Sequence, residues 1–166
     1  MRLRPLRIDD EAAARAANEA MRADDYPFLL FYDPERRWAD HLRVLERFHR
    51  GQRLPNGMVP STFLVAVVDG EIVGRASIRH RLNRNLERDG GHIGYAVLPP
   101  HRRRGHATAI LRQSLVVLHS YGVDDALLTC DEGNLASAAV IERCGGELDS
   151  VITLASGERN RRYWIR

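Results

Sequence analysis

The sequence contains little cysteine, and its two cysteines, Cys130 and Cys144, do not form a Cys-x-x-Cys pair. This scarcity argues against a disulfide framework and against a zinc site. No apolar run approaches the roughly 18 residues that a membrane-spanning helix needs. The first residues, 1–7, lack the apolar core of a signal peptide. We therefore expect a protein of the reducing cytoplasm that does not associate with membranes.

The chain also lacks a strong excess of charge of either sign. It has 25 Lys and Arg against 22 Asp and Glu, which gives a net charge of +3. No aromatic residue is interleaved with the Arg102–Arg104 triplet, so we expect no nucleic-acid partner. With 166 residues, of which 44% are hydrophobic, residues 1–166 are predicted to form one domain with a full core.

The most informative stretch is residues 94–108. An apolar strand, predicted at 93–98, stops at Pro99-Pro100 because proline removes a backbone donor and fixes φ. A short basic turn follows, and a helical run then begins that includes residues 109–118. The pattern predicts a strand, a turn and a helix in direct succession.

The start of that helix is predicted to bind an anion. A helix N-terminus presents unpaired N–H groups and the positive end of the helix dipole. Gly105 and Ala107 have almost no side chain, so an anion can approach the backbone, and the Arg102–Arg104 guanidinium groups are suited to phosphate. We therefore expect a phosphate group, and specifically a pyrophosphate, at this turn.

Two blocks of the sequence resemble a known family. Val97-x-Pro99-x-x-Arg102-x-x-Gly105-x-Ala107 is similar to the acyl-coenzyme A signature of the GNAT N-acetyltransferases, (Gln/Arg)-x-x-Gly-x-(Gly/Ala). Residues 127–137, with Asn134 and Ser137, and the following Gly145-Gly146 resemble the fifth strand and the next helix of that family. The resemblance covers roughly residues 60–150, and it is greatest to the branch labelled only "predicted acetyltransferase".

The expected elements follow the same order as in the family. Helices are predicted at 11–21, from Pro34 to Gly51, at about 106–121 and at 134–144, and strands at 2–8, 62–68, 71–78, 93–98, 125–130 and on both sides of Ser156-Gly157. Asp69-Gly70 is a hairpin turn, because these residues tolerate positive φ. This order predicts a mixed α/β (α+β) fold, with a mostly antiparallel central sheet of about seven strands and four helices.

The resemblance implies a site for acetyl-CoA as the acyl donor. Its residues would be Val97, Leu98, Arg102, Arg103, Arg104, Gly105, His106, Ala107, Thr108, Asn134 and Ser137. In the family, the fourth strand diverges from the fifth, and the freed backbone N–H groups of Val97 and Leu98 would hold the pantetheine and polarise the thioester. Asn134 also has the simpler reading of a helix cap.

Two residues are candidates for catalysis. His92 is the candidate base, since relatives place a carboxylate near this position and its ordinary pKa of about 6.5 suits the task; its alternative is a structural role on a half-buried strand. Asp131, Glu132 and His80 are weaker candidates. Many relatives place a proton-donating Tyr seven residues after the Asn, where this chain has Ile141. That acid would be replaced by Tyr95, Ser137 or a water, or the reaction needs no dedicated acid.

The sequence thus predicts an acetyl-CoA-dependent N-acetyltransferase that acts directly on a primary amine in a ternary complex. The alternative is a catalytically silent module that binds or senses acyl-CoA. The expected partners are acetyl-CoA and an amine that the sequence does not identify, and the protein is expected to be a monomer or a homodimer. Aromatic residues at 26–32 and arginines at 79–88 are expected near the acceptor.

Overall fold

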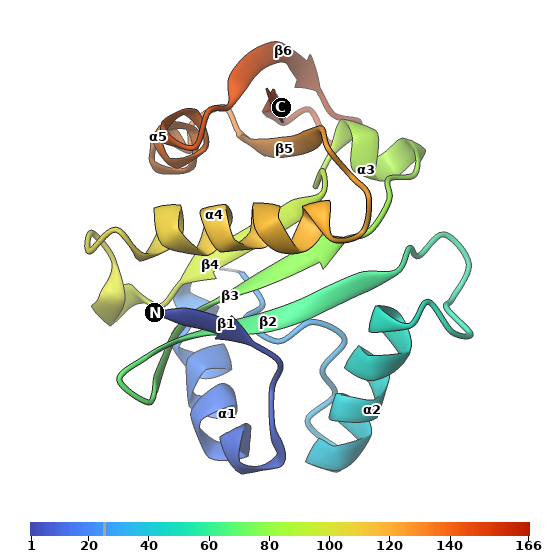
Figure 1. The fold of residues 1–166 in the computed structure, drawn as a ribbon, viewed down its shortest axis with the longest axis vertical. Helices are drawn as coiled ribbons and strands as arrows, with labels where there is room; N and C mark the ends of the chain where they lie inside the picture. The colour runs from blue at the N-terminus through green and yellow to red at the C-terminus, as the bar shows by residue number, and fades with distance from the viewer. Residues whose placement is uncertain (25) are drawn as a thin grey trace.

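The computed structural model describes residues 1–24 and 26–166 and shows two antiparallel sheets with helices around them (Figure 1). The strands are β1 (Arg2–Arg4), β2 (Ser61–Val68), β3 (Glu71–Arg79), β4 (Ile93–Val97), β5 (Ala126–Asp131), β6 (Glu147–Thr153) and β7 (Arg159–Ile165). The helices are α1 (Glu11–Ala20), α2 (Trp38–His49), α3 (Arg84–Arg88), α4 (His106–His119) and α5 (Leu135–Arg143). The predicted mixed α/β class is confirmed.

The strands divide into a four-stranded sheet, in the order β1-β2-β3-β4, and a three-stranded sheet, in the order β5-β7-β6. All strand pairs within both sheets are antiparallel. In Figure 1, α1 and α2 lie below the larger sheet, α4 lies above it, and the smaller sheet and α5 form the upper part of the molecule. The predicted single sheet is therefore split between β4 and β5.

Strand β2 contributes side chains to two hydrophobic cores, one on each face of the larger sheet. Its side chains alternate in direction. Val65 and Val67 pack into the core shared with α1 and α2, whereas Leu64 and Ala66 pack into the core shared with α4, α5 and the smaller sheet. A strand buried on both faces reads as a continuous apolar run, which explains its sequence.

Two predicted elements differ in the structure. The second helix begins at Trp38 and not at Pro34, since Asp33 starts a turn in which its Oδ1 accepts the N–H of Glu35. The connection between β3 and β4 was predicted without a helix, but it contains α3, whose start is capped by the Asn83 side chain. The other predicted elements agree within a few residues.

Candidate active site

The two sheets meet at one point, where Gly91 and His92 contact β5. The His92 N–H donates to the Leu127 carbonyl at 2.7 Å, and the Leu127 N–H donates to Nδ1 of His92 at 2.9 Å. Gly91 has φ of +55°, and a Cβ there would lie 2.4 Å from the Leu127 oxygen, so only glycine fits. Beyond this junction, β4 and β5 share no ladder among the described residues.

Strand β4 therefore has an open edge. The Leu98 N–H donates to the Val73 carbonyl, and the register pairs Gly94 with Ser77 and Ala96 with Arg75, so the even-numbered residues 94–98 bond to β3. Because backbone groups alternate in direction along a strand, the N–H groups of Ile93, Tyr95 and Val97 face away from β3, toward β5. The divergence of the two strands leaves these donors available to a ligand.

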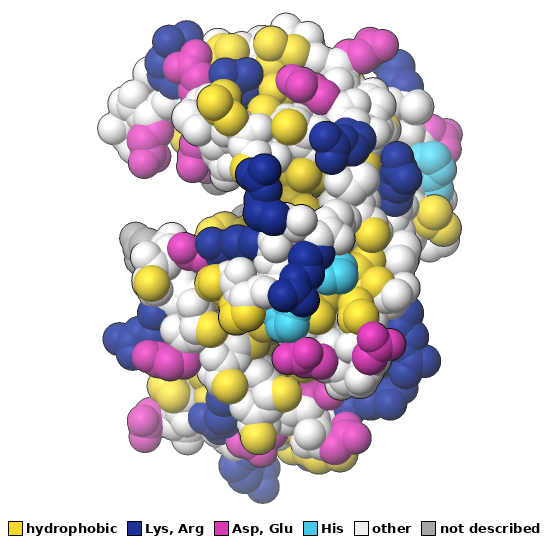
Figure 2. Space-filling view, turned by 90° about the vertical axis from the view of Figure 1, so that its left-hand side faces the viewer, with side chains coloured by type: hydrophobic (Ala, Val, Ile, Leu, Met, Phe, Trp, Pro, Cys, Tyr) yellow, Lys and Arg dark blue, Asp and Glu magenta, His cyan; other side chains and the backbone are white. Residues whose placement is uncertain are grey.

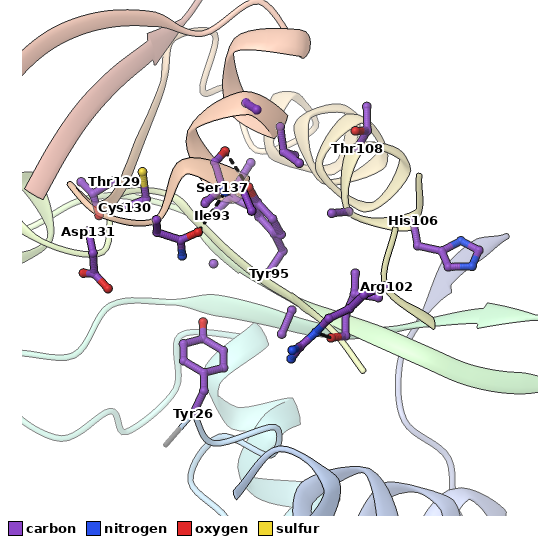
Figure 3. A pocket seen from close by; sticks show the side chains of 18 of the residues that line it. Tyr26, Ile93, Tyr95, Arg102, His106, Thr108, Thr129, Cys130, Asp131 and Ser137 are labelled. Carbon is purple, nitrogen blue, oxygen red and sulfur yellow. Dashed lines mark hydrogen bonds between the residues drawn. The ribbon is translucent and has the colours of Figure 1, made fainter. Parts of the chain in front are cut away.

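A cleft of about 1000 Å³ lies along this edge. Figure 2 shows it as a deep hollow between the two halves of the molecule, with arginine side chains around its mouth. In Figure 3, Arg102, His106 and Thr108 lie on one side, Thr129, Cys130 and Asp131 lie on the other, and Tyr95 and Ser137 lie between them. The cleft is thus continuous from the basic turn to the end of β5.

The basic turn has the geometry of an anion site. Arg103 and Gly105 adopt positive φ values of 63° and 79°, which fold the chain sharply before α4. The first intrahelical bond runs from the Ala109 N–H to the Gly105 carbonyl, so the N–H groups of residues 106–108 precede it. A Cβ on Gly105 would meet nothing within 4 Å, which leaves open space in front of these donors.

Arg102 joins this turn to the segment after α1. Its Nε donates to the Val97 carbonyl at 3.1 Å, and its Nη2 is paired with the Asp24 carboxylate. Arg102 therefore orients the end of β4 while its guanidinium still lines the cleft. Arg143, at the end of α5, also lines the cleft; the adjacent Cys144 bonds to the Thr108 carbonyl, which places Arg143 near the same turn.

Tyr95 lies at the middle of the cleft. Its hydroxyl is 2.9 Å from Oγ of Ser137, whose N–H is bonded to the Asn134 side chain at 3.0 Å. Burial raises the pKa of the Tyr95 hydroxyl to about 12, more than its bond to Ser137 lowers it. The phenol therefore keeps its proton at neutral pH.

Most of the residues predicted for the acyl-CoA site line this one cleft. They are Val97, Arg102, Arg103, Gly105, His106, Ala107, Thr108, Asn134 and Ser137, together with Tyr95. Leu98, Arg104 and His92 do not line it. The Leu98 N–H is already bonded to β3, and the His92 side chain is buried with its Nδ1 accepting the Leu127 N–H. Burial, followed by the charge of Arg79, lowers the pKa of His92.

Ile141 and Cys130 have different surroundings. Ile141, at the position where relatives have Tyr, is fully buried in the core against Gly146 and does not line the cleft. Cys130 does line the cleft, but burial raises the pKa of its thiol, so it stays protonated and weakly nucleophilic.

The weaker candidates and the expected acceptor residues are dispersed. Of the aromatic residues predicted at the acceptor, Tyr26 lines the cleft, whereas Phe28 is buried and Phe31 stacks on Phe48. Asp131 lines the cleft, while the neighbouring Glu132 pairs with Arg159 outside it. Of the arginines at 79–88, only Arg79 is part of the lining.

Sequence reasoning missed several polar residues of the cleft, among them Asp89, Asn160 and Arg143. Asp89 and Asn160 come from a loop and from β7, and no motif links them. For Arg143, the basic residue in the last turn of a helix gave only a general signal for helix ends. Their convergence on the cleft is a property of the tertiary fold.

The described residues contain neither a candidate membrane-spanning helix nor a candidate metal site. No helix within 1–24 or 26–166 is long and apolar enough to cross a membrane. The same residues contain no group of three or more His, Cys, Asp or Glu side chains that would hold a metal ion.

Comparison with solved structures shows that the arrangement is shared. The chain is 22% identical to Mycobacterium smegmatis RimJ in complex with CoA-disulfide, with a TM-score of 0.73 over 98% of this chain and 80% of that one. It is 16% identical to yncA, a putative acetyltransferase from Salmonella typhimurium with acetyl-CoA, with a TM-score of 0.65 over 99% and 92%. A ribosomal-protein-alanine N-acetyltransferase from Brucella melitensis is 16% identical, with a TM-score of 0.67 over 99% of both chains. At these identities the likeness establishes the fold.

No curated protein sequence matches the chain. The family described as the acetyltransferase (GNAT) domain matches residues 1–147. This match spans most of the chain and includes β4, the basic turn and α5. The chain therefore belongs to the GNAT acetyltransferase family.

Proposed function

We propose that this protein is an N-acetyltransferase that moves the acetyl group of acetyl-CoA to a primary amine by direct transfer in a ternary complex. The observation that carries the proposal is the single cleft that joins the basic turn, the open edge of β4 and the polar end of β5. Direct transfer requires that thioester and amine be held together in one cavity, where proximity replaces a bimolecular encounter.

The donor would occupy the side of the cleft near α4. The N–H groups at 106–108, with Arg103 and Arg143, form the seat for the pyrophosphate. Asn134 and Ser137 lie further along the cleft and would contact the pantetheine arm. Two of the similar structures hold CoA-disulfide or acetyl-CoA, which supports the same donor here.

The open edge of β4 would supply the electrostatic part of catalysis. When the amine attacks, negative charge develops on the thioester oxygen. The N–H groups of Tyr95 and Val97 face the cleft and are fixed by the pairing of β4 with β3. Donors placed in this way are worth on the order of 3 kcal/mol each to the transition state.

Tyr95 is proposed as the acid that protonates the departing thiolate. Its pKa of about 12 keeps the hydroxyl protonated, and Ser137 Oγ at 2.9 Å holds it in place. This assignment replaces the tyrosine that relatives carry on the helix, since Ile141 is buried away from the cleft. The acid would thus come from β4 instead of α5.

Direct transfer is favoured over an acyl-enzyme. Cys130 is the cysteine that lines the cleft, and its raised pKa disfavours the thiolate that would attack acetyl-CoA. Cys130→Ser is therefore expected to keep the rate of transfer, whereas a covalent route would lose it.

The test of the proposed function is release of CoA thiol from acetyl-CoA in the presence of a panel of primary amines. We expect amine-dependent thiol release together with formation of the acetylated amine. Binding of acetyl-CoA with no release for any amine would instead support the silent acyl-CoA-binding module. The buried Ile141 is the observation that favours this second candidate.

A further inference from the structure

Three polar side chains meet at the end of the cleft that lies away from the basic turn. Asp131 of β5 and Asn160 of β7 are direct partners in the strand ladder, so their side chains share one face of the smaller sheet. Asn160 Nδ2 donates to Oδ1 of Asp89, in the loop before β4, at 2.8 Å. Asp89, Asp131 and Asn160 all line the cleft.

Asn160 carries an unsatisfied acceptor. The residue is 2% exposed, and its Oδ1 has no hydrogen-bond donor among the described residues. Its orientation is fixed, since the amide N–H group must face the carboxylate of Asp89. Buried polar groups without partners are costly and few in native proteins, so this oxygen is suited to receive an N–H donor that enters the cleft.

The charges at this end favour a cation. Within residues 1–24 and 26–166, neither Asp89 nor Asp131 has a Lys, Arg or His nitrogen within 4.0 Å. Arg79 also lines this part of the cleft, where its Nη1 donates to the carbonyls of Gly90 and Gly91 at 2.8 and 3.1 Å. The side chains that line this end therefore include two carboxylates without a salt-bridge partner among the described residues, and an ammonium group would supply the N–H donors that they lack. The guanidinium groups of Arg75 and Arg79 lie at Gly94.

We infer, on the basis of the function proposed above, that Asp89, Asp131 and Asn160 form the site that receives the acceptor amine as its ammonium ion. An alkylammonium group has three N–H donors and no acceptor, which matches two carboxylates and one amide oxygen. Asn160 is a positioning residue that directs one N–H, and the carboxylates hold the charge.

The chemical step follows from this placement. A carboxylate of the cluster takes one proton from the ammonium, which leaves a neutral amine with a lone pair. Its nitrogen bonds to the thioester carbon, the C–S bond breaks, and the sulfur leaves with the electron pair. The thiolate takes the proton of Tyr95, and the second proton of the amine passes to solvent. The carboxyl of the cluster then releases its proton and the Tyr95 phenolate regains one, so that one proton is released overall. The products are the amide and free CoA thiol.

The binding experiment uses CoA, which cannot transfer an acetyl group. Calorimetry measures binding of n-butylamine, phenethylamine and cadaverine to the complex of protein with CoA, with n-butanol as the neutral analogue. We expect at least one amine to bind and the alcohol not to bind. Asp89→Asn and Asp131→Asn should each lower the affinity for the amine by about tenfold or more, since each removes a charge-assisted hydrogen bond. Asn160→Leu should also weaken it.

Glu132→Gln is the matched control, because Glu132 is adjacent to Asp131 but pairs with Arg159 outside the cleft. It should bind the amine as the wild type does, and all variants should keep their affinity for CoA. The inference is overturned if no amine binds the wild-type complex, if butanol binds equally well, or if both Asp variants match Glu132→Gln.

Steady-state kinetics separates this inference from the proposed function. If the variants raise KM for the amine and leave KM for acetyl-CoA unchanged, the result supports both the ammonium site and the proposed transferase. Amine binding without any thiol release would refute the transferase and leave the ammonium site intact. Transfer with an unchanged amine KM in both Asp variants would refute the site and leave the transferase intact.

Discussion

His92 is a residue for which the sequence left two roles open, a catalytic base or a structural residue. Its Nδ1 accepts the Leu127 N–H, and its own N–H donates to the Leu127 carbonyl. The residue is 6% exposed, and the divergence of β4 from β5 begins immediately after it. These contacts support a role as the junction of the two sheets, whereas its role as a base remains a prediction from the sequence.

Two substitutions separate these roles. His92→Asn keeps an acceptor oxygen near the position of Nδ1, so we expect a folded enzyme with nearly wild-type kcat/KM. If His92 is the base, kcat/KM of this variant should instead fall by about 10²–10⁴-fold at neutral pH, and by less at high pH. His92→Ala leaves the Leu127 N–H unpaired and should cost about 1–3 kcal/mol of stability, measured by denaturant unfolding. A large pH-dependent loss of kcat/KM in His92→Asn would show that His92 acts as the catalytic base.

Tyr95→Phe tests the proposed acid. Removing the hydroxyl should lower kcat by about 10²-fold while the affinity for acetyl-CoA stays near that of the wild type. Acyl donors with a better leaving group than the CoA thiol should recover much of the loss, because their departure needs no proton. Stopped-flow assays with both kinds of donor provide the measurement. An equal loss with both donors would mean that Tyr95 acts through the fold alone.

At the scale of elements, the turn before α4 is the part of the site that the sequence predicts well. Its signals are local: a strand ended by Pro99-Pro100, a glycine at positive φ and a helix start. Gly105→Glu would place a negative side chain in front of the N–H groups at 106–108. We expect loss of acetyl-CoA binding in calorimetry, with little loss of fold.

The control for this change is Gly105→Gln. Both side chains occupy the left-handed conformation at φ +79° and share its strain of roughly 1–2 kcal/mol. The difference between the two variants therefore isolates the charge. If Gly105→Glu binds acetyl-CoA as well as Gly105→Gln does, the turn does not bind the pyrophosphate.

Other elements show where local signals fail. Asp33-Pro34 is typical of a helix start, but the same dipeptide also starts a turn. Here the Arg36 N–H bonds to the Asp33 carbonyl in such a turn, and α2 begins only at Trp38. The five residues of α3 are too few to show a helical period. Asn160 and Asp89 are 71 positions apart, so their hydrogen bond depends on the packing of β7 against the loop before β4. Contacts of this kind cannot be derived from spacing.

At the scale of the whole molecule, histidines that are buried or half-buried link stability to pH. His80 bonds through Nε2 to Thr62 Oγ1 at 2.8 Å and stacks on Tyr121 at 3.7 Å. Burial, followed by the charge of His49, lowers the pKa of His80 to about 4. The unfolded chain has the ordinary value of about 6.5 and so binds more protons between these two values.

The contribution of His80 to stability is therefore complete above about pH 6.5 and is lost as pH falls toward 4. His41 and His92, whose pKa values are also lowered by burial, act in the same direction. We expect the thermal midpoint to fall over this range in wild type, and to fall less steeply in His80→Gln. Equal slopes for the two proteins in scanning calorimetry would show that His80 titrates normally in the fold.

The composition of the chain also predicts how it responds to its own donor. All 25 basic side chains are arginine, and there is no lysine. Guanidinium groups remain protonated at neutral pH and are not acetyl acceptors, so no side chain in residues 1–166 is a primary amine. After prolonged incubation with acetyl-CoA, intact-mass and peptide mass spectrometry should find no hydroxylamine-resistant acetyl group on any side chain of residues 1–166. An acetyl group that hydroxylamine removes would indicate a thioester. A thioester at Cys130 would contradict direct transfer, because burial raises the pKa of that thiol and keeps it protonated. Cys130→Ser, which removes the thiol, is the control that identifies such an adduct.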